Sequence, residues 1–271
     1  MSHPIALTIA GSDSGGGAGI QADLKTFSAL RVYGASVITA ITAQNTRTVA
    51  AVEAVSPAMI GAQLDAVFGD LDIRAVKIGM VGGPEAIAVV AERLAAFLAN
   101  DPVPVVLDPV MVAKSGDPLL PADAVASLRD RLLPLATVLT PNLPEAARLL
   151  GLAPPTTPDA VADQGRALLA LGPAHVLMKG GHAAGETCTD LLLGPEPLTL
   201  SAPRQTTRNT HGTGCSMSSA IAAGLARGMT MPDAVRAAHG WLQGAIAAAD
   251  TLSVGLGHGP VHHFHAIWGQ A

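Results

Sequence analysis

The sequence has few aromatic and few charged residues, which make up 3% and 14% of its 271 positions. Its two cysteines, Cys188 and Cys215, are too few for a disulfide framework, so a reducing compartment is the expected setting. Lysine and arginine total 16 against 21 acidic residues and form no dense basic run. No apolar stretch reaches the ~18 residues of a membrane span, and the first residues lack the features of a signal peptide. We therefore expect a cytoplasmic protein that binds neither nucleic acid nor membrane.

Apolar residues make up 49% of the chain, enough for a large core, and short apolar runs alternate with helical patterns. The strands are expected at 5–10, 35–43, 75–80, 103–107, 136–139 and 175–179, with a hairpin at 189–193 and 198–200. The helices are expected at 18–30, 59–68, 84–98, 122–132, 145–150 and 158–171, with two more beginning near Gly212 and Pro232. Strands that are apolar throughout are buried on both faces, as in a parallel sheet covered by helices. Because no linker interrupts this pattern, we predict one α/β domain over residues 1–271.

Glycines and polar residues follow six of the predicted strands. They are Gly11-Ser12-Asp13, Gln44-Asn45, Gly79-Met80, Asp108-Pro109, Thr140-Pro141-Asn142 and Lys179-Gly180-Gly181-His182. In an open parallel sheet, ligands bind outside the carboxyl ends of the strands. This edge of the sheet is therefore the predicted active site.

The glycine-rich segment after the first strand has two interpretations. Residues 17–22 satisfy the loose dinucleotide-binding fingerprint, but that fingerprint also requires an acidic residue at the end of the second strand, where Gln44 and Asn45 stand. The other interpretation is a structural turn between a strand and a helix. A P-loop NTPase is excluded, because the sequence contains no Gly-x4-Gly-Lys-Ser/Thr motif.

The sequence Gly212-Thr213-Gly214-Cys215 opens a helix of small residues. Backbone N–H groups at such a helix start can hold an anion or stabilise developing negative charge. Cys215 is expected in the first turn, where the helix dipole favours the thiolate and lowers the pKa of the thiol below its ordinary value of about 8.5. Cys215 is therefore a candidate base, and the alternative is a small cysteine packed behind the helix start.

Three charged side chains also follow predicted strands. Asp108 and Glu145 supply carboxylate oxygens, which a hydrated Mg²⁺ prefers when it bridges to phosphates. Their alternative roles are a turn aspartate and a first-turn helix glutamate. Lys179 is placed to contact phosphate as a point charge, or else is a solvated strand end.

With these motifs, the chain resembles the ribokinase-like superfamily and, within it, the bacterial hydroxymethylpyrimidine/phosphomethylpyrimidine kinase family. The resemblance spans nearly the whole chain. Seven blocks carry it in order: 10–23, 44–45, 77–80, 107–111, 140–146, 179–182 and 211–215. It implies a three-layer α/β/α sandwich and a MgATP-dependent kinase. Such a kinase phosphorylates 4-amino-5-hydroxymethyl-2-methylpyrimidine and then its monophosphate, for thiamine synthesis.

The resemblance also implies roles for individual residues. Gln44 is expected to bind the aminopyrimidine, Met80 to pack on its ring, and Asp23 and the backbone of Gly11 to lie near it. Cys215 is expected to face the hydroxymethyl group. Roles at the phosphates are implied for seven residues: Asp108, Asn142 and Glu145 with Mg²⁺ and phosphates, Lys179 with the ATP phosphates, and Gly212, Thr213 and Gly214 in the anion hole.

The chain departs from the superfamily pattern at several positions. Sugar kinases have aspartate where Cys215 stands, but phosphoryl transfer through a loose transition state needs little activation of the nucleophile. His239 stands where a lysine is common, which puts one ATP contact in doubt, and His262 stands where asparagine is frequent. We expect the histidines between 258 and 265 to close over one edge of the fold as a polar tail rather than to bind a metal.

Two other functions remain open from the sequence. A pyridoxal or pyridoxine kinase uses the same fold and a similar hydroxymethyl group on a flat ring. A non-catalytic ligand-binding module is disfavoured by the joint presence of Asp108, Glu145, Lys179 and Cys215. By analogy with the family we expect a homodimer, and we expect residues 113–118 and the glycine-rich segment to move over the substrate.

Overall fold

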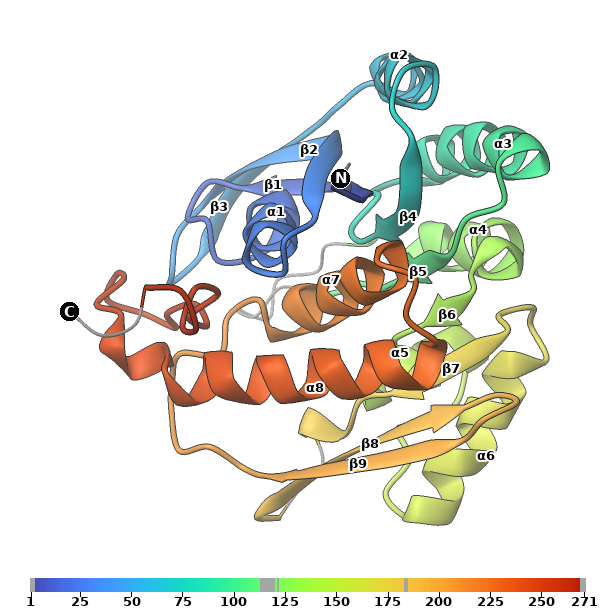
Figure 1. The fold of residues 1–271 in the computed structure, drawn as a ribbon. Helices are drawn as coiled ribbons and strands as arrows, with labels where there is room; N and C mark the ends of the chain where they lie inside the picture. Colours follow the sequence, from blue (N-terminus) through green and yellow to red (C-terminus); the bar gives the residue numbers. More distant parts are fainter. Residues whose placement is uncertain (1–2, 113–119, 121, 183–184, 269–271) are drawn as a thin grey trace.

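Nine strands form one sheet in the computed structural model, which describes residues 3–112, 120, 122–182 and 185–268 (Figure 1). The strands are β1 (Ile5–Asp13), β2 (Tyr33–Gln44), β3 (Val49–Ala54), β4 (Ile73–Ile78), β5 (Val105–Leu107), β6 (Val138–Leu139), β7 (His175–Met178), β8 (Thr187–Leu193) and β9 (Leu198–Pro203). Their order is β3-β2-β1-β4-β5-β6-β7-β8-β9. The six central strands, β2, β1, β4, β5, β6 and β7, pair in parallel, whereas β3, β8 and β9 pair antiparallel at the two edges. The predicted mostly parallel sheet is confirmed.

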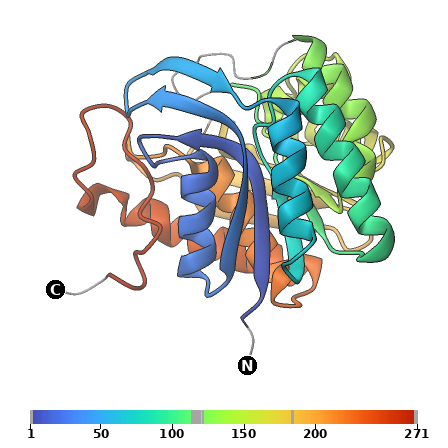
Figure 2. The same cartoon turned by 90° about the horizontal axis from the view of Figure 1, so that it is seen from above.

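Helices cover both faces of this sheet (Figures 1 and 2). They are α1 (Gly19–Ala29), α2 (Pro57–Phe68), α3 (Pro84–Asn100), α4 (Ala122–Arg131), α5 (Leu143–Leu150), α6 (Pro158–Leu169), α7 (Thr213–Ala226) and α8 (Met231–Ala247). One core packs α2 to α6 against the sheet, and a second core packs α1, α7 and α8 against the opposite face. The fold is therefore the predicted three-layer α/β/α sandwich.

Strand β3 was not predicted from the sequence. Its six residues lie at the sheet edge, and five of them are exposed, so the strand carries no buried apolar run. It turns back from β2 through residues 45–48 and pairs with residues 40–44. Edge strands of this kind give a weak sequence signal, because the periodicity of strands comes mainly from burial.

The parallel strands end at one edge, and the loops that follow them form the surface described below. Residues 113–118, which we expected to move over the substrate, lie outside the described residues. Within the described ranges, none of the helices combines the length and the apolar character needed to cross a bilayer.

Candidate active site

Lys179 and Asp108 form an ion pair at the carboxyl ends of β7 and β5. Lys179 Nζ lies 2.7 Å from Asp108 Oδ1, and both side chains are largely buried. Thr140 and Ser218 donate further hydrogen bonds to the Asp108 carboxylate, at 3.2 and 3.3 Å. Burial opposes the charge on Lys179, but Asp108 and Glu145 outweigh it and raise the pKa of the ammonium. Lys179 therefore stays protonated within this pair at neutral pH.

Glu145 and Asn142 form a capping box at the start of α5. The Asn142 side chain accepts a hydrogen bond from the Glu145 backbone, and the Glu145 carboxylate accepts one from the Asn142 backbone, both at 2.8 Å. The backbones of Asn142 and Lys179, which directly follows β7, form an isolated parallel β-bridge. Burial raises the pKa of Glu145 to about 7, against the lowering effect of Lys179. This carboxyl group therefore changes its charge near neutral pH.

Residues 211–214, called the anion loop below, lead into the first turn of α7, and Gly214 lies against the Lys179–Asp108 pair. A Cβ atom on Gly214 would be 3.4 Å from Lys179 Nζ and 3.7 Å from Asp108 Oδ2, so the two charged groups directly adjoin the first turn of α7. Gly212 has a φ of 80°, and a Cβ there would lie 1.9 Å from the Gly17 carbonyl oxygen, so only glycine fits. The helix start, with its N–H groups, and a lysine thus face the same place.

Cys215 lies in the first turn of α7 and is half-buried. Burial raises the pKa of its thiol to about 11, although Lys77 and a hydrogen bond from the Gly19 backbone lower it in part. The predicted lowering by the helix dipole is therefore wrong, because desolvation of the sulfur outweighs it. At neutral pH the group is a thiol, which can donate or accept a weak hydrogen bond but is a poor base.

Asp13, at the end of β1, binds the glycine-rich segment and His211. Its carboxylate accepts hydrogen bonds from the backbones of Gly15, Gly17 and Ala18 at 2.8 to 3.0 Å. His211 Nε2 lies 2.9 Å from Asp13 Oδ2. Burial opposes the charge on Asp13, but the contacts with His211 and Ala18 together outweigh it and lower the pKa of the carboxyl group. Three N–H groups of the segment are therefore occupied by Asp13, which favours the structural-turn interpretation.

The residues predicted to bind the acceptor lie beside this pair. The Gln44 side chain is 3.4 Å from His211 Nε2, next to the anion loop. The Gly11 N–H donates to the Met80 carbonyl, and a Cβ on Gly11 would be 2.3 Å from Met80 Cε, so the methionine side chain passes over the glycine. Gln44 and Met80 are both half-buried. The structure thus places Gln44 next to the loop that leads to Cys215.

Asp23 occupies a different environment from the one expected. It is fully buried and forms an ion pair with Lys77, whose Nζ lies 2.8 Å from Asp23 Oδ2. Lys77 is equally buried. The Asp23 carboxylate is therefore enclosed between α1 and β4, where it does not reach an open surface.

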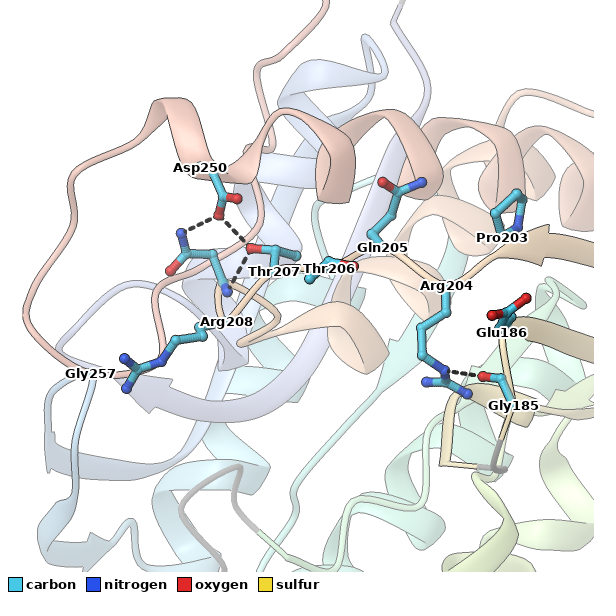
Figure 3. Close-up of a pocket in the computed structure, with 11 residues that line it drawn as sticks. Gly185, Glu186, Pro203, Arg204, Gln205, Thr206, Thr207, Arg208, Asp250 and Gly257 are labelled. Atoms are coloured by element: carbon cyan, nitrogen blue, oxygen red, sulfur yellow. Dashed lines mark hydrogen bonds between the residues drawn. The ribbon is translucent and has the colours of Figure 1, made fainter.

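An open cleft of about 900 Å³ lies beside the anion loop (Figure 3). Its lining comprises Gly185, Glu186, residues 203–209, Asp250 and Gly257. Asp250 accepts hydrogen bonds from Thr207 and from Asn209 Nδ2, the latter at 2.8 Å, and Arg204 binds the Gly181 and Gly185 carbonyls. The sequence motifs did not identify this cleft, because its lining comes from segments without a shared pattern.

Two histidines near the C-terminus, His262 and His263, are buried, whereas the sequence predicted a polar tail. His263 is buried and lies 3.0 Å from the Ser216 hydroxyl in α7, and burial lowers the pKa of its ring to about 3. His262 is buried as well, whereas His258 is exposed. His239 is buried in α8 and interacts electrostatically with Asp190 on β8. Within the described residues, no group of three or more histidine, cysteine or carboxylate side chains could hold a metal.

Comparison with known proteins identifies the family. The model of the family described as phosphomethylpyrimidine kinase matches residues 13–262. A hydroxymethylpyrimidine/phosphomethylpyrimidine kinase from Rhizobium meliloti is 59% identical over 97% of this chain and 98% of its own length. A bifunctional thiamine biosynthesis protein from Geobacter sulfurreducens is 48% identical over 96% of this chain, which covers 52% of that protein.

A solved structure of a related kinase has the same fold. The ADP complex of Bacillus subtilis pyridoxal kinase has a TM-score of 0.89 and 36% identity, covering 99% of this chain and all of that one. The predicted ribokinase-like sandwich is thereby confirmed. The chain belongs to the hydroxymethylpyrimidine/phosphomethylpyrimidine kinase family and is a kinase of thiamine biosynthesis.

Proposed function

We propose that the chain transfers the γ-phosphoryl group of ATP to the hydroxymethyl group of 4-amino-5-hydroxymethyl-2-methylpyrimidine, and a second one to the resulting monophosphate. The observation that carries this proposal is the position of the Lys179–Asp108 pair against Gly214, in the first turn of α7. A lysine and helix N–H groups that face one point supply fixed positive charge where a phosphoryl group passes between two oxygens.

The acceptor lies on the Gln44 side of Cys215 in this proposal. Gln44 hydrogen-bonds the aminopyrimidine edge, and Met80 packs on the ring above Gly11. Since the thiol of Cys215 is protonated at neutral pH, it orients the hydroxymethyl oxygen rather than removing its proton. Such a role is sufficient because a loose transition state requires positioning more than deprotonation.

Magnesium fits the donors at the sheet edge. Asp108 and Glu145 provide two buried carboxylates beside the lysine, and Mg²⁺ is commonly held by one or two carboxylates together with substrate phosphates and water. Bound there, the ion neutralises charge on the ATP phosphates. Asn142 keeps Glu145 in place through the capping box, and Lys179 contacts the phosphates directly.

The nucleoside part of ATP occupies the open cleft in this proposal. The cleft begins two residues before His211, and Arg204 ties one wall to Gly181, two residues after Lys179. A triphosphate that reaches the anion loop therefore leaves its nucleoside among residues 203–209. Asp250 and Asn209 present polar groups there, although each is already bonded to the other.

A second candidate, phosphorylation of pyridoxal or pyridoxine, is favoured by the similarity to the pyridoxal kinase structure. The higher identity to the hydroxymethylpyrimidine/phosphomethylpyrimidine kinase favours the pyrimidine. The test measures kcat/KM with MgATP for the pyrimidine alcohol, its monophosphate and pyridoxine, with products identified by mass. The proposal predicts that both pyrimidines exceed pyridoxine, and turnover of pyridoxine alone would overturn it.

The homodimer and the cytoplasmic location stay predictions. The molar mass of the protein in solution, measured by light scattering, tests the first. A mass near that of one 27.2 kDa chain would contradict it.

A further inference from the structure

Lys77 and Asp23 form a buried ion pair beneath Cys215, and the phosphoryl transfer proposed for this site does not use it. Lys77 on β4 and Asp23 on α1 are both 0% exposed, with 2.8 Å between Nζ and Oδ2. Ser219 in α7 donates to Asp23 at 2.6 Å. Because Cys215 stands four residues before Ser219 in the same helix, the two side chains share one helix face. Cys215 therefore lies on the side of α7 that faces the pair.

The negative end of this pair is saturated with hydrogen bonds. Asp23 accepts from Thr8 Oγ1 and from Ser219 Oγ, both at 2.6 Å, as well as from Lys77. The Lys77 ammonium has three N–H donors, and in the described part of the chain Asp23 is its one hydrogen-bond acceptor. Two neutral hydroxyl groups thus stabilise the Asp23 carboxylate besides Lys77, whereas the ammonium has donors that Asp23 does not use.

The positive end of the pair lies toward the acceptor site. A Cβ on Gly79 would be 2.7 Å from Lys77 Nζ, so the ammonium lies directly behind the residue that precedes Met80. Lys77 lowers the pKa of the Cys215 thiol by more than Asp23 raises it. Because glycine has no side chain and the region is buried, little material screens the ammonium from the acceptor.

We propose that Lys77 is a specificity-determining residue which favours the anionic acceptor, the pyrimidine monophosphate, over the neutral alcohol. This inference rests on the proposed function. The position of the acceptor oxygen carries this assignment. In both transfers the oxygen that attacks ATP must lie beside Cys215 and the anion loop.

The two transfers differ in the charge that enters this place. In the first, the hydroxymethyl oxygen attacks the γ-phosphorus of ATP, the bond to the β-phosphate oxygen breaks, and ADP and the hydroxyl proton leave. In the second, an oxygen of the monophosphate attacks the γ-phosphorus and a P–O–P bond forms as the bond to the β-phosphate oxygen breaks. ADP leaves, but no hydroxyl proton is released. The second acceptor therefore brings about two negative charges next to Cys215. A fixed cation beneath Gly79 offsets the repulsion between this phosphate and ATP.

Stability alone does not account for the pair. Replacement of a buried ion pair by apolar residues of similar volume is often neutral or stabilising. An apolar residue at position 77 would lack the charge that this proposal assigns to Lys77.

The test compares the wild type with Lys77→Gln and with the double variant Lys77→Met plus Asp23→Asn, which leaves no buried charge unpaired. Thr8→Val is the matched control, because it removes one hydrogen bond to Asp23 and keeps both charges. Thermal unfolding monitors the fold, and kcat and KM are measured separately for the pyrimidine alcohol and for the monophosphate with MgATP.

We expect each folded Lys77 variant to lose at least about tenfold in kcat/KM for the monophosphate relative to the alcohol, which corresponds to about 1.4 kcal/mol. Thr8→Val should keep the wild-type ratio. An equal fall for both acceptors, or the same selective fall in Thr8→Val, would overturn the inference. If the wild type itself phosphorylates neither pyrimidine, the proposed function fails, and this inference fails with it.

Discussion

His211 Nε2 lies 2.9 Å from Asp13 Oδ2, and this contact joins the glycine-rich segment after β1 to the loop that precedes α7. The backbone of His211 is held in turn by Gly259, whose carbonyl accepts its N–H at 3.0 Å. A Cβ on Gly17 would be 2.3 Å from His211 Cδ2, so an edge of the ring lies against the segment. The two loops around Cys215 are therefore linked to each other through the Asp13–His211 contact, and the first prediction tests what this contact contributes.

Asp13→Ala should lower the free energy of unfolding by about 2–3 kcal/mol, since it leaves buried N–H donors without an acceptor. The pKa of Asp13 is lowered in the folded state, so its stabilisation is full above the ordinary value of 3.8 and is lost as pH falls through the lowered value. Urea denaturation measures the change. Ser14→Ala, which alters an exposed contact with Gln44 next to Asp13, serves as control. Equal stability of the two variants would contradict the account.

Cys215 should react slowly with iodoacetamide at neutral pH, because burial raises the pKa of its thiol to about 11. Cys188, which is half-buried on β8, provides an internal comparison within the same molecule. Mass spectrometry of the alkylated peptides gives both rates. Faster alkylation of Cys215 than of Cys188 would show a thiolate and restore its role as a base.

Binding of Mg²⁺ with ATP should weaken as pH falls from about 8 to about 6, because Glu145, with a pKa raised to about 7 by burial, gains a proton in this range. Glu145→Gln should bind Mg²⁺ more weakly and lose this pH dependence. Activity titrated against Mg²⁺ at several pH values measures both effects. An unchanged pH dependence in the variant would remove Glu145 from the metal site.

Asp250→Ala should raise KM for ATP several-fold and leave KM for the pyrimidine unchanged, since Asp250 orders Thr207 and Asn209 in the cleft (Figure 3). Asp163→Ala, on an exposed face of α6, is the control for loss of a surface carboxylate. Steady-state kinetics with each substrate varied in turn distinguishes the two KM values. A rise in KM for the pyrimidine alone would place the nucleotide elsewhere.

Much of the fold is predictable from the sequence, because burial on both faces leaves continuous apolar runs such as Val105–Leu107. The phosphate side of the site is predictable for a related reason. Lys179, Asp108 and Gly214 each follow a strand or open a helix, and the sheet brings such positions to one edge.

Other features depend on tertiary contacts that have no local signal. The sequence suggests a lowered pKa for Cys215, but the desolvation that raises it comes from packing against residues far away in the chain. Likewise, nothing near Asp23 indicates that its partner is Lys77, 54 residues later. The cleft around Asp250 also joins segments without a common motif.

The stoichiometry of ADP release tests the central claim most directly. One equivalent of the pyrimidine alcohol is incubated to completion with excess MgATP, and ADP and the pyrimidine products are quantified. The account predicts two ADP molecules for each pyrimidine and the diphosphate as the final product. Release of one ADP with accumulation of the monophosphate, or no release at all, would contradict it.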